Sequence, residues 1–380
     1  MPSISDLLKK QENLRRSVVP LQPSENVMTR NATMALSSDF NHRYSLSMDS
    51  EYRGSKMDNA YAGTRFSEEL IEKTEKLAAL SFKMDFADVR PISGHLAAMQ
   101  VLGNLLKKGD SFLYIPQEWG GYDGYESIYL PRMFGLKGRK FPMKNWKIDY
   151  EKLGGIETDY AALVLGASVF FHPYDLKKLR KFFPDSLILY DASHVLGLLS
   201  QGLFQKDLDL VDILYGSTHK NFPGPQGGII IGKGEFENKI KEQVIWKYYD
   251  NFHLARIAAL GISFEFLERS DYGVRCIKNT EALIKTLREF QVHFVNEPEV
   301  TESCMFMLDH ENPAELSRKL ERHHILIDRI GRVGLNEATM RGLRPQEMKV
   351  IGGVIKKVIY GEKFHSATIL RPVLDKMNDL

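Results

Sequence analysis

Short apolar segments alternate with helical segments through the middle of this chain, and that alternation constrains its fold more than any other feature. Brief apolar runs bounded by polar or glycine-rich residues predict strands, whereas apolar residues spaced three and four apart predict helices. Strands are predicted at 111–115, 161–165, 187–190, 213–215 and 228–231, and helices at 67–82, 93–106 and 173–183. Strands that follow one another through helices pair in parallel, so we expect an α/β fold with a mainly parallel sheet between helices. Such sheets bind ligands at the carboxyl ends of their strands.

The chain divides into three predicted parts. Residues 1–60 begin with a short amphipathic helix and then become irregular, which is typical of an arm or interface segment. Residues 61–265 hold the strand–helix alternation and are expected to form a large domain that binds the cofactor. A second pattern of short strands and helices predicts a small C-terminal α/β domain over residues 266–380.

Composition argues against several classes of partner. The 51 Lys and Arg residues nearly balance the 49 Asp and Glu residues, so no excess of charge favours nucleic acid. No apolar run approaches the roughly 18 residues that span a bilayer, so we expect no membrane partner. The two cysteines, Cys276 and Cys304, are too few for a disulfide framework and favour a reducing, cytoplasmic location. Adjacent His323 and His324 would point in different directions from a helix, so we predict no metal site.

An aspartate ends the strand predicted at 187–190. The segment reads Leu-Ile-Leu-Tyr-Asp191-Ala-Ser-His194, and a carboxylate buried at a strand end is costly without a cationic partner. A protonated pyridine nitrogen would supply that partner, and the carboxylate would keep the ring an electron sink. His194 could lie beside such a ring or orient the aspartate. The alternative interpretation is that Asp191 caps the segment that follows it.

A histidine–lysine pair follows the strand predicted at 213–215, in Ser-Thr-His219-Lys220-Asn-Phe-Pro-Gly-Pro-Gln-Gly-Gly. A lysine that is partly desolvated at the mouth of a sheet readily forms a Schiff base. The prolines and glycines would fix the turn that presents it. Taken alone, a lysine after a strand is usually a solvated surface charge. Its place after Asp191 favours the catalytic interpretation.

A turn of small residues, Ser93-Gly94-His95, enters the helix predicted at 93–106. Free N–H groups and the helix dipole make such a turn a seat for phosphate, although the same residues also serve as an ordinary N-cap. With Asp191 and Lys220, this turn completes the set of groups that pyridoxal 5'-phosphate requires.

In this order and spacing, the motifs resemble the serine hydroxymethyltransferase family, whose members have pyridoxal-phosphate fold type I. The resemblance begins at Leu21-Gln-Pro-Ser24-Glu25-Asn26, continues through Ser93-Gly94, Asp191-Ala-Ser-His194 and Thr218-His219-Lys220, and ends at Ala338-Thr339-Met340-Arg341-Gly342. It spans most of the chain and implies a seven-stranded sheet in the large domain.

The resemblance implies a role for each matching residue. Lys220 would hold the cofactor and Asp191 would pair with its ring nitrogen, while Ser24 and Arg341 would hold the substrate carboxylate. Tyr61 matches an active-site tyrosine of the second subunit, so the resemblance implies a homodimer with its active site at the subunit interface. The other positions that would line the cofactor are Ser93, Gly94, His95, Trp119, Ser168, His194 and His219.

Three segments depart from the family pattern. The family's Tyr-Ala-Glu element reads Tyr44-Ser-Leu46 here, which keeps a tyrosine for the substrate but loses a catalytic carboxylate. A different alignment offers Glu51 as that carboxylate and loses the tyrosine. The glycine-rich loop after the cofactor lysine is replaced by residues 247–253, and the segment before the substrate arginine is shortened to 328–333. The carboxylate and the shortened segment both concern folate, so the use of tetrahydrofolate stays open.

The sequence therefore predicts a pyridoxal-phosphate enzyme that makes or breaks the Cα–Cβ bond of a small β-hydroxy α-amino acid, with His219 or Glu51 as the base. Glycine and an aldehyde would be the partners of this bond, with or without folate. True tetrahydrofolate-dependent hydroxymethyl transfer and transamination are the alternative chemistries. A non-catalytic scaffold of the same fold is a further alternative, which the joint presence of Lys220, Asp191 and Arg341 disfavours.

Overall fold

The computed structural model describes residues 1–242 and 244–378. The chain folds into two compact units. One, called here the sheet unit, comprises Met28–Ser168 and Pro173–Ser270; the other, called the C-terminal unit, comprises Met1–Val27, Val169–His172 and Asp271–Leu380. Among the described residues, no helix combines the length and the apolar character needed to cross a membrane.

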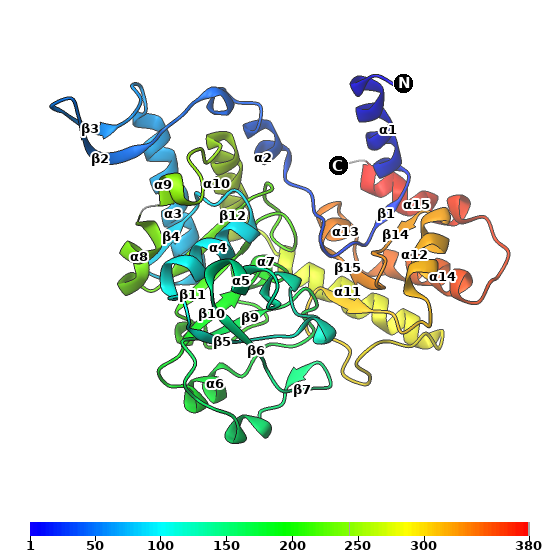
Figure 1. Ribbon diagram of the computed structural model, residues 1–380. Coiled ribbons are helices and arrows are strands. Elements are labelled where there is room, and N and C mark those ends of the chain that lie inside the picture. The colour runs from blue at the N-terminus through cyan, green and yellow to red at the C-terminus, as the bar shows by residue number, and fades with distance from the viewer. Residues whose placement is uncertain (243, 379–380) are drawn as a thin grey trace. The chain divides into compact units, whose positions relative to one another are not determined.

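A seven-stranded sheet forms the centre of the sheet unit, in the order β4-β12-β11-β10-β9-β5-β6 (Figure 1). The strands are β4 (Phe86–Asp88), β5 (Ser111–Tyr114), β6 (Lys137–Lys140), β9 (Ala162–Gly166), β10 (Leu187–Asp191), β11 (Ile213–Ser217) and β12 (Gly228–Gly232). The five strands from β11 to β6 are parallel, whereas β12 runs antiparallel to both β11 and β4. The predicted α/β fold with a mainly parallel seven-stranded sheet is confirmed.

The central strands are apolar along their whole length because both faces of the sheet are covered. Every residue of β9, β11 and β12 is buried, and a strand buried on both faces has a continuous rather than an alternating apolar sequence. The longer helices of this unit are α3 (Arg65–Phe82), α4 (Gly94–Leu105), α6 (Leu176–Phe182) and α10 (Leu254–Glu268). Its short elements are α2 (Arg30–Ala35), α5 (Leu130–Phe134), α7 (Leu196–Leu199), α8 (Glu237–Lys241), α9 (Val244–Lys247), β7 (Met143–Lys144) and β8 (Lys147–Ile148).

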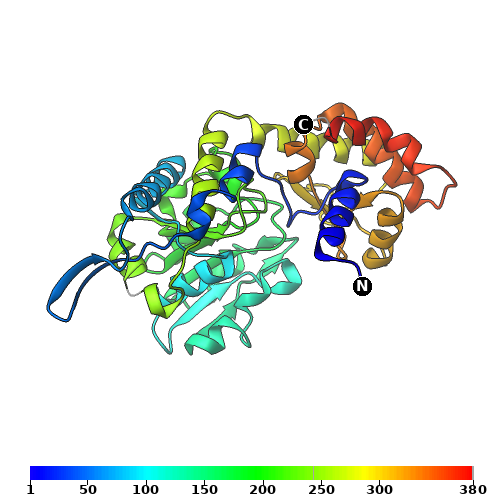
Figure 2. The same cartoon turned by 90° about the horizontal axis from the view of Figure 1, so that it is seen from above.

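Residues 28–64 contain more regular structure than the sequence predicted. Strands β2 (Ser47–Tyr52) and β3 (Ser55–Asn59) form an antiparallel hairpin that projects from the sheet unit in both views (Figures 1 and 2). Its turn is Arg53-Gly54, where both residues have positive φ. The prediction of an irregular segment is wrong here, because the hairpin is mostly polar and lacks the alternation that marks a strand with one buried face.

The C-terminal unit combines both ends of the chain. Strand β1 (Val19–Pro20) pairs in parallel with β14 (Ile325–Leu326), and β13 (Met305–Met307) pairs with β15 (Arg332–Gly334). Its helices are α1 (Ile4–Arg16), α11 (Tyr272–Glu289), α12 (Pro313–Arg322), α13 (Asn336–Met340), α14 (Pro345–Ile359) and α15 (Ser366–Asn378). The predicted amphipathic helix at the N-terminus is confirmed.

Candidate active site

Three neighbouring strands of the sheet end side by side and carry the predicted cofactor residues. In the register of the sheet, Asp191 on β10 lies opposite Gly166 on β9 and Tyr215 on β11. The segments that follow these strands contain Ser168, His194 and Lys220. They therefore begin at one edge of the sheet, the carboxyl edge at which parallel sheets bind ligands.

Asp191 is buried, with 6% of its surface exposed, and is surrounded by neutral donors. Its Oδ2 accepts a hydrogen bond from the Tyr125 hydroxyl at 2.7 Å. Its Oδ1 accepts one from the Ser193 hydroxyl at 2.6 Å and one from the Ser193 backbone N–H at 3.1 Å. Among the described residues, no hydrogen-bond partner of Asp191 carries a charge, so the carboxylate has room for a cationic donor.

A chain of aromatic residues extends from Asp191 toward helix α4. The Tyr125 hydroxyl lies 2.8 Å from the Tyr215 hydroxyl, and the ring of Tyr125 packs edge-to-face on Tyr122. Tyr122 in turn bonds His95 Nδ1 at 2.9 Å. Burial, with the Asp191 charge in addition, raises the pKa of Tyr125 well above its ordinary value, so the phenol stays protonated and can donate. Sequence analysis missed Tyr125, because nothing local links it to an aspartate 66 positions away.

Lys220 lies three residues beyond the end of β11 and directly follows His219 in the chain. Its Nζ is 3.5 Å from His194 Nε2, and His194 is buried. The Nδ1 atom of His219 is buried and has no hydrogen-bond partner among the described residues. Burial, helped by the Lys220 charge, lowers the pKa of His219 to about 4, so its imidazole is neutral at physiological pH.

The loop after Lys220 is closed by its own hydrogen bonds. The Thr218 hydroxyl donates to Pro225 O at 2.7 Å, and the backbone N–H groups of Thr218 and Gly224 donate to Gly227 O and Thr218 O. These bonds fix the backbone on both sides of Lys220. The sequence prediction that prolines and glycines shape this turn agrees with the geometry.

The N-terminus of helix α4 lies against the end of β11. Ser93 caps the helix, since its hydroxyl accepts a hydrogen bond from the Leu96 N–H at 3.1 Å. A Cβ added at Gly94 would lie 2.2 Å from Ser217 Oγ, and one at Gly228 would lie 2.2 Å from Ser93 O. Glycine is required at both positions because the backbone segments approach each other too closely for a side chain. This approach brings the helix N-terminus to the same sheet edge as Lys220.

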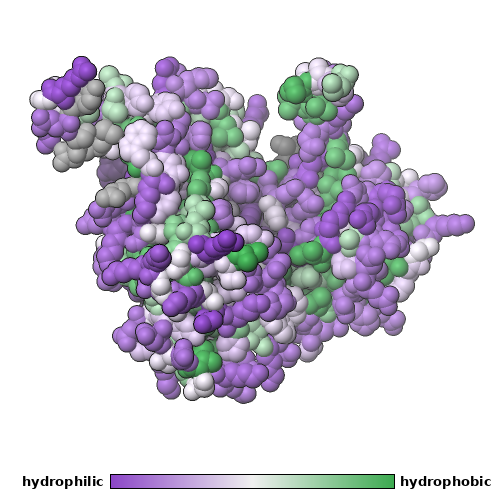
Figure 3. All heavy atoms as spheres, viewed as in Figure 1, coloured by the Kyte–Doolittle hydropathy of each residue, from purple (hydrophilic) through white to green (hydrophobic). Residues whose placement is uncertain are grey.

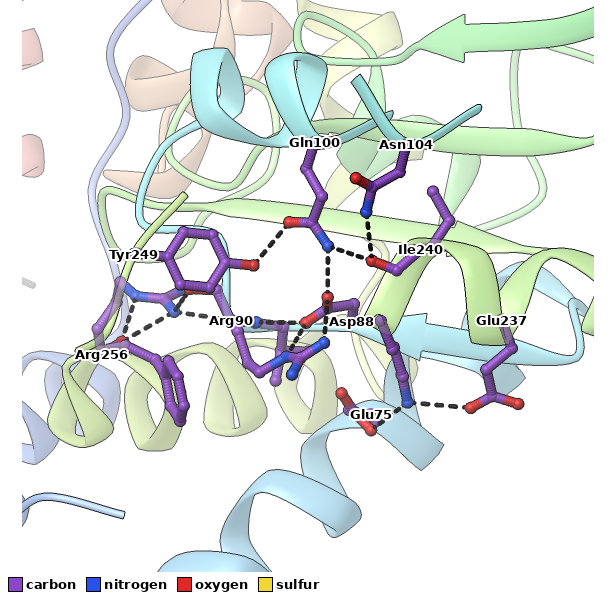
Figure 4. Close-up of polar contacts among 12 residues, drawn as sticks. Glu75, Asp88, Arg90, Gln100, Asn104, Glu237, Ile240, Tyr249 and Arg256 are labelled. Carbon is purple, nitrogen blue, oxygen red and sulfur yellow. Dashed lines mark hydrogen bonds and ion pairs between the residues drawn. The ribbon is translucent and has the colours of Figure 1, made fainter. Parts of the chain in front are cut away.

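A buried charged cluster supports this turn from the other side (Figure 4). Arg90 bonds both oxygens of Asp88 at 2.8 Å, and Gln100 donates to the same carboxylate at 2.8 Å. The Tyr249 hydroxyl donates to Gln100 Oε1 at 2.6 Å. Arg256 Nη2 donates to the carbonyl oxygens of Val89 at 2.7 Å and of Arg90 at 3.3 Å. The strand-to-helix turn that contains Ser93 is thus fixed by salt bridges and hydrogen bonds at its base.

The segments of Trp119 and Ser168 are also joined at this edge. The Ser168 N–H donates to Gly120 O at 2.7 Å, and Gly121 forms a bridge with Ala167. A Cβ at Gly121 would lie 1.8 Å from Ile115 O, so only glycine fits there. The Trp119 ring is half-buried and packs edge-to-face on Trp146, with ring centroids 5.8 Å apart.

These residues fit pyridoxal phosphate. The first turn of α4 offers N–H groups for an anion, the Asp191 carboxylate is buried with only neutral partners, and an amine lies nearby on the next strand end. The glycines at positions 94 and 228 let the N-terminus of α4 approach the end of β11 closely, which places these groups at one edge of the sheet. Arrangement and chemistry together define the site of a pyridoxal-phosphate enzyme of fold type I.

The tyrosines predicted to contact substrate lie on either side of the hairpin. Tyr44 and Tyr61 are each 45% exposed, and their ring centroids are 5.3 Å apart. Leu46 is buried, its N–H donates to Asn59 Oδ1, and its carbonyl accepts from the Ala60 N–H. Glu51 is exposed and lies opposite Lys56 in the hairpin.

Ser24 and Arg341 both belong to the C-terminal unit. The segment before Ser24 is fixed against the one before Arg341, because Gly334 N donates to Leu21 O at 2.8 Å and Asn336 Nδ2 donates to Pro23 O at 3.0 Å. Arg341 follows helix α13 directly, and its Nε donates to Glu337 at 2.8 Å.

Comparison with known proteins agrees with this assignment. The family model described as "Serine hydroxymethyltransferase" matches residues 1–355. Curated serine hydroxymethyltransferases include one from Methanothermobacter marburgensis that is 32% identical, covering 94% of this chain and 89% of that protein. Another, from Thermococcus kodakarensis, is 31% identical and covers 96% and 91%. The fold resembles that of L-threonine transaldolase from Pseudomonas fluorescens, with a TM-score of 0.87, 21% identity and coverage of 99% of this chain and 90% of that one.

The chain belongs to the serine hydroxymethyltransferase family. It is a pyridoxal-phosphate enzyme of the hydroxymethyltransferase or aldolase type, and enzymes of this family act on small amino acids. The predicted family, fold class and cofactor are confirmed.

Proposed function

We propose that the enzyme cleaves, and in reverse forms, the Cα–Cβ bond of a small β-hydroxy α-amino acid, giving glycine and an aldehyde without a need for folate. The observation that carries the folate-free part is Leu46. It stands where the family pattern has a carboxylate, is 3% exposed, and its backbone is fixed on both sides by Asn59 and Ala60. The alternative carboxylate, Glu51, is itself exposed.

Lys220 and Asp191 are assigned to the cofactor. The Lys220 amine would bind the cofactor aldehyde covalently, and the Asp191 carboxylate would accept the ring N–H. Pyridoxal phosphate, when bound, supplies a pyridinium ring that accepts the electron pair released at Cα. Ser93, Gly94 and His95 would bind its phosphate at the N-terminus of α4, and Trp119, Ser168 and His194 would line the ring.

His219 is the proposed base for the β-hydroxyl proton. Its imidazole is neutral because burial and the Lys220 charge lower its pKa to about 4, so Nδ1 or Nε2 is available to accept. A base with so low a pKa is weak. The Lys220 contribution to the lowering disappears whenever that amine is uncharged, which would strengthen His219 as a base in the loaded enzyme.

Ser24 and Arg341 are assigned to the substrate carboxylate, and the tyrosines Tyr44 and Tyr61 to substrate contacts. A guanidinium suits a carboxylate because two parallel N–H groups bond both oxygens. Holding the carboxylate fixes which bond at Cα is broken.

The test is to incubate holoenzyme with L-threonine, L-serine and phenylserine, with and without tetrahydrofolate, and to follow aldehyde and glycine. The expected result is aldehyde release at the same rate with and without folate, and loss of this reaction in Lys220→Ala. Serine consumption only with folate would replace this proposal by true hydroxymethyl transfer. Formation of a keto acid would indicate transamination, and tightly bound cofactor with no reaction of any amino acid would indicate a scaffold.

We propose further that the enzyme is a homodimer whose active site is completed by Tyr61 of the second subunit. Two regions with exposed apolar or aromatic side chains support this: Tyr44 and Tyr61, and Ile4, Leu7 and Leu8 of α1. Figure 3 shows hydrophobic surface on α1. Mixing inactive Lys220→Ala with a Tyr61→Ala variant tests it. Mixed dimers should regain activity at one of their two sites, whereas an active site confined to one chain would show no recovery.

A further inference from the structure

A chain of alternating charges connects helix α1 to Arg341 within the C-terminal unit. Arg15, in the last turn of α1, pairs with Glu25 through Nη1 at 3.0 Å and with Glu337 Oε2 through Nη2. The other oxygen of Glu337, Oε1, accepts a hydrogen bond from Arg341 Nε at 2.8 Å. The order is therefore Glu25, Arg15, Glu337, Arg341, and each charge lies next to the opposite one.

The central carboxylate of this chain is the most deeply buried. The Glu337 side chain is 2% exposed, against 18% for Arg15 and 21% for Arg341. A buried carboxylate needs compensating charge and filled hydrogen-bond sites. Glu337 obtains both from two guanidinium groups, one on each oxygen. The three groups Arg15, Glu337 and Arg341 together carry a formal charge of +1.

Glu337 also determines how Arg341 is presented. The Arg341 backbone N–H donates to Glu337 O at 2.8 Å, and its Nε is held by the Glu337 carboxylate. Among the described residues, Nη1 and Nη2 of Arg341 have no hydrogen-bond partner. Two parallel N–H groups thus remain for a planar carboxylate.

We propose that Glu337 and Arg15 are positioning residues of the substrate-carboxylate site. Glu337 orients the Arg341 guanidinium through Nε. Arg15 cancels the charge of Glu337, so that Arg341 keeps its full positive charge for the substrate. This inference rests on the proposed role of Arg341. Without Arg15, the Glu337 carboxylate would neutralise Arg341 or draw its Nη groups away from the ligand.

The experiment measures glycine binding to the holoenzyme by calorimetry, with glycinamide as the ligand that lacks a carboxylate. Arg15→Met should weaken glycine binding by about tenfold, as expected for loss of one charge-assisted contact, and should leave glycinamide binding unchanged. The double variant Arg15→Met with Glu337→Gln should recover most of the glycine affinity. Glutamine still accepts from Arg341 Nε, and the site regains its charge of +1.

The matched control is Arg16→Met, which removes the same charge from the exposed neighbouring position on α1 and should change neither affinity. Since no residue of α1 is buried, Arg15→Met should fold, and its thermal unfolding is recorded alongside. Arg15→Lys, which keeps the charge, serves as a second variant and should bind glycine nearly as the unaltered enzyme does.

Two results would overturn the inference. One is a double variant that binds glycine no better than Arg15→Met, as a purely structural role or a direct Arg15–substrate contact predicts. The other is an equal loss of glycine and glycinamide binding. Arg341→Met separates this outcome from failure of the proposed function. If that variant binds glycine normally, the carboxylate site lies elsewhere and both proposals fall; if it loses glycine while Arg15→Met does not, only the present inference falls.

Discussion

Two buried aspartates end strands of the same sheet, and their surroundings differ in one respect. Asp88 ends β4 and is bonded at both oxygens by the Arg90 guanidinium, so its charge is compensated within the protein. Asp191 ends β10 and is bonded only by hydroxyl and backbone N–H groups of Tyr125 and Ser193. The charge of Asp88 is already compensated once the chain has folded. The second has its hydrogen bonds but no countercharge from its described neighbours, as a site for a cationic ring nitrogen requires.

The difference separates stability from function. A buried ion pair that loses one member destabilises the fold, because the remaining charge has no partner. A buried carboxylate held by neutral donors instead reserves its strongest interaction for a ligand. Although burial opposes ionisation, Arg90 holds the pKa of Asp88 below its usual value. Asp88 should therefore control the free energy of unfolding, and Asp191 the affinity for cofactor.

The largest expected effect is that of Asp88→Asn. It leaves Arg90 without its carboxylate, and breaking a buried pair in this way costs about 3–5 kcal/mol of unfolding free energy. Urea denaturation of the protein with and without cofactor measures this loss, which should be the same in both. Asp85→Asn, an exposed position in the same segment, is the control and should change stability little. A loss below about 1 kcal/mol would mean that Asp88 is not the support inferred here.

Asp191→Asn should lower the affinity for cofactor and leave the stability of the cofactor-free protein intact, the reverse of Asp88→Asn. Removing the charge should leave the cofactor-free protein as stable as before or more so, because no described cation depends on it. Cofactor affinity should fall by about 1.5–3 kcal/mol, the value of a hydrogen bond to a charged group. Equilibrium dialysis gives the affinity and urea denaturation the stability. Unchanged affinity, or a cofactor-free protein weakened as much as by Asp88→Asn, would remove the distinction between the two aspartates.

Most of the cofactor edge could be predicted from the sequence, because its residues follow strands that an apolar pattern reveals. Asp191 and Lys220 were predicted in this way, and the Ser93 turn from its small residues before a helix; the sheet register and the close approach of Gly94 to Ser217 bring these segments together. The partners that fix these residues could not be predicted. Tyr125 and Arg256 act over long separations in the chain, and neither lies in a motif.

The hairpin of β2 and β3 is a second region that could not be predicted from the sequence. Its polar residues gave no periodic signal, and the two alignments that offered Leu46 or Glu51 could not be separated by pattern alone. Burial of Leu46 and exposure of Glu51 are properties of the folded chain. The Glu337–Arg15 pair is a similar case, since the two residues are 322 positions apart and are brought together by long-range contacts such as the pairing of β1 with β14 and the Asn336–Pro23 hydrogen bond.

A smaller, pH-dependent effect tests whether the Asp88 charge influences the pKa of its neighbour Glu75. Burial, with the Asp88 charge in addition, raises the pKa of Glu75 to about 7, even though Lys241 bonds it at 2.9 Å (Figure 4). Because the folded pKa lies above the unfolded one, the contribution of Glu75 to stability is full below about pH 4.5 and is lost as pH rises to about 7. Relative to Glu75→Gln, the unaltered protein should lose about 3 kcal/mol across this window.

Denaturation series at several pH values measure this difference. Glu69→Gln, which makes the same substitution at an exposed position on the same helix, is the matched control. In an Asp88→Asn background the window should shift to lower pH, since one cause of the raised pKa is gone. A difference that grows in the opposite direction, as pH falls, would show that Lys241 outweighs burial at Glu75.

The smallest expected effect compares the two tyrosines that serve the two carboxylate sites. Tyr125→Phe removes the donor to Asp191 Oδ2, and Tyr249→Phe removes the donor to Gln100, which itself bonds Asp88. Each should destabilise the cofactor-free protein by about 1 kcal/mol, the net value of one hydrogen bond.

With cofactor bound, the two variants should differ in stability. A carboxylate that has lost a neutral donor accepts a cationic one more strongly, so cofactor should restore stability to Tyr125→Phe and leave the loss in Tyr249→Phe unchanged. The measurement is the rise in thermal midpoint on adding saturating cofactor, which should be larger for Tyr125→Phe than for the unaltered protein. Equal rises in both variants would mean that the cofactor draws no more on Asp191 than on Asp88, and the comparison between the two aspartates would then fail at its central point.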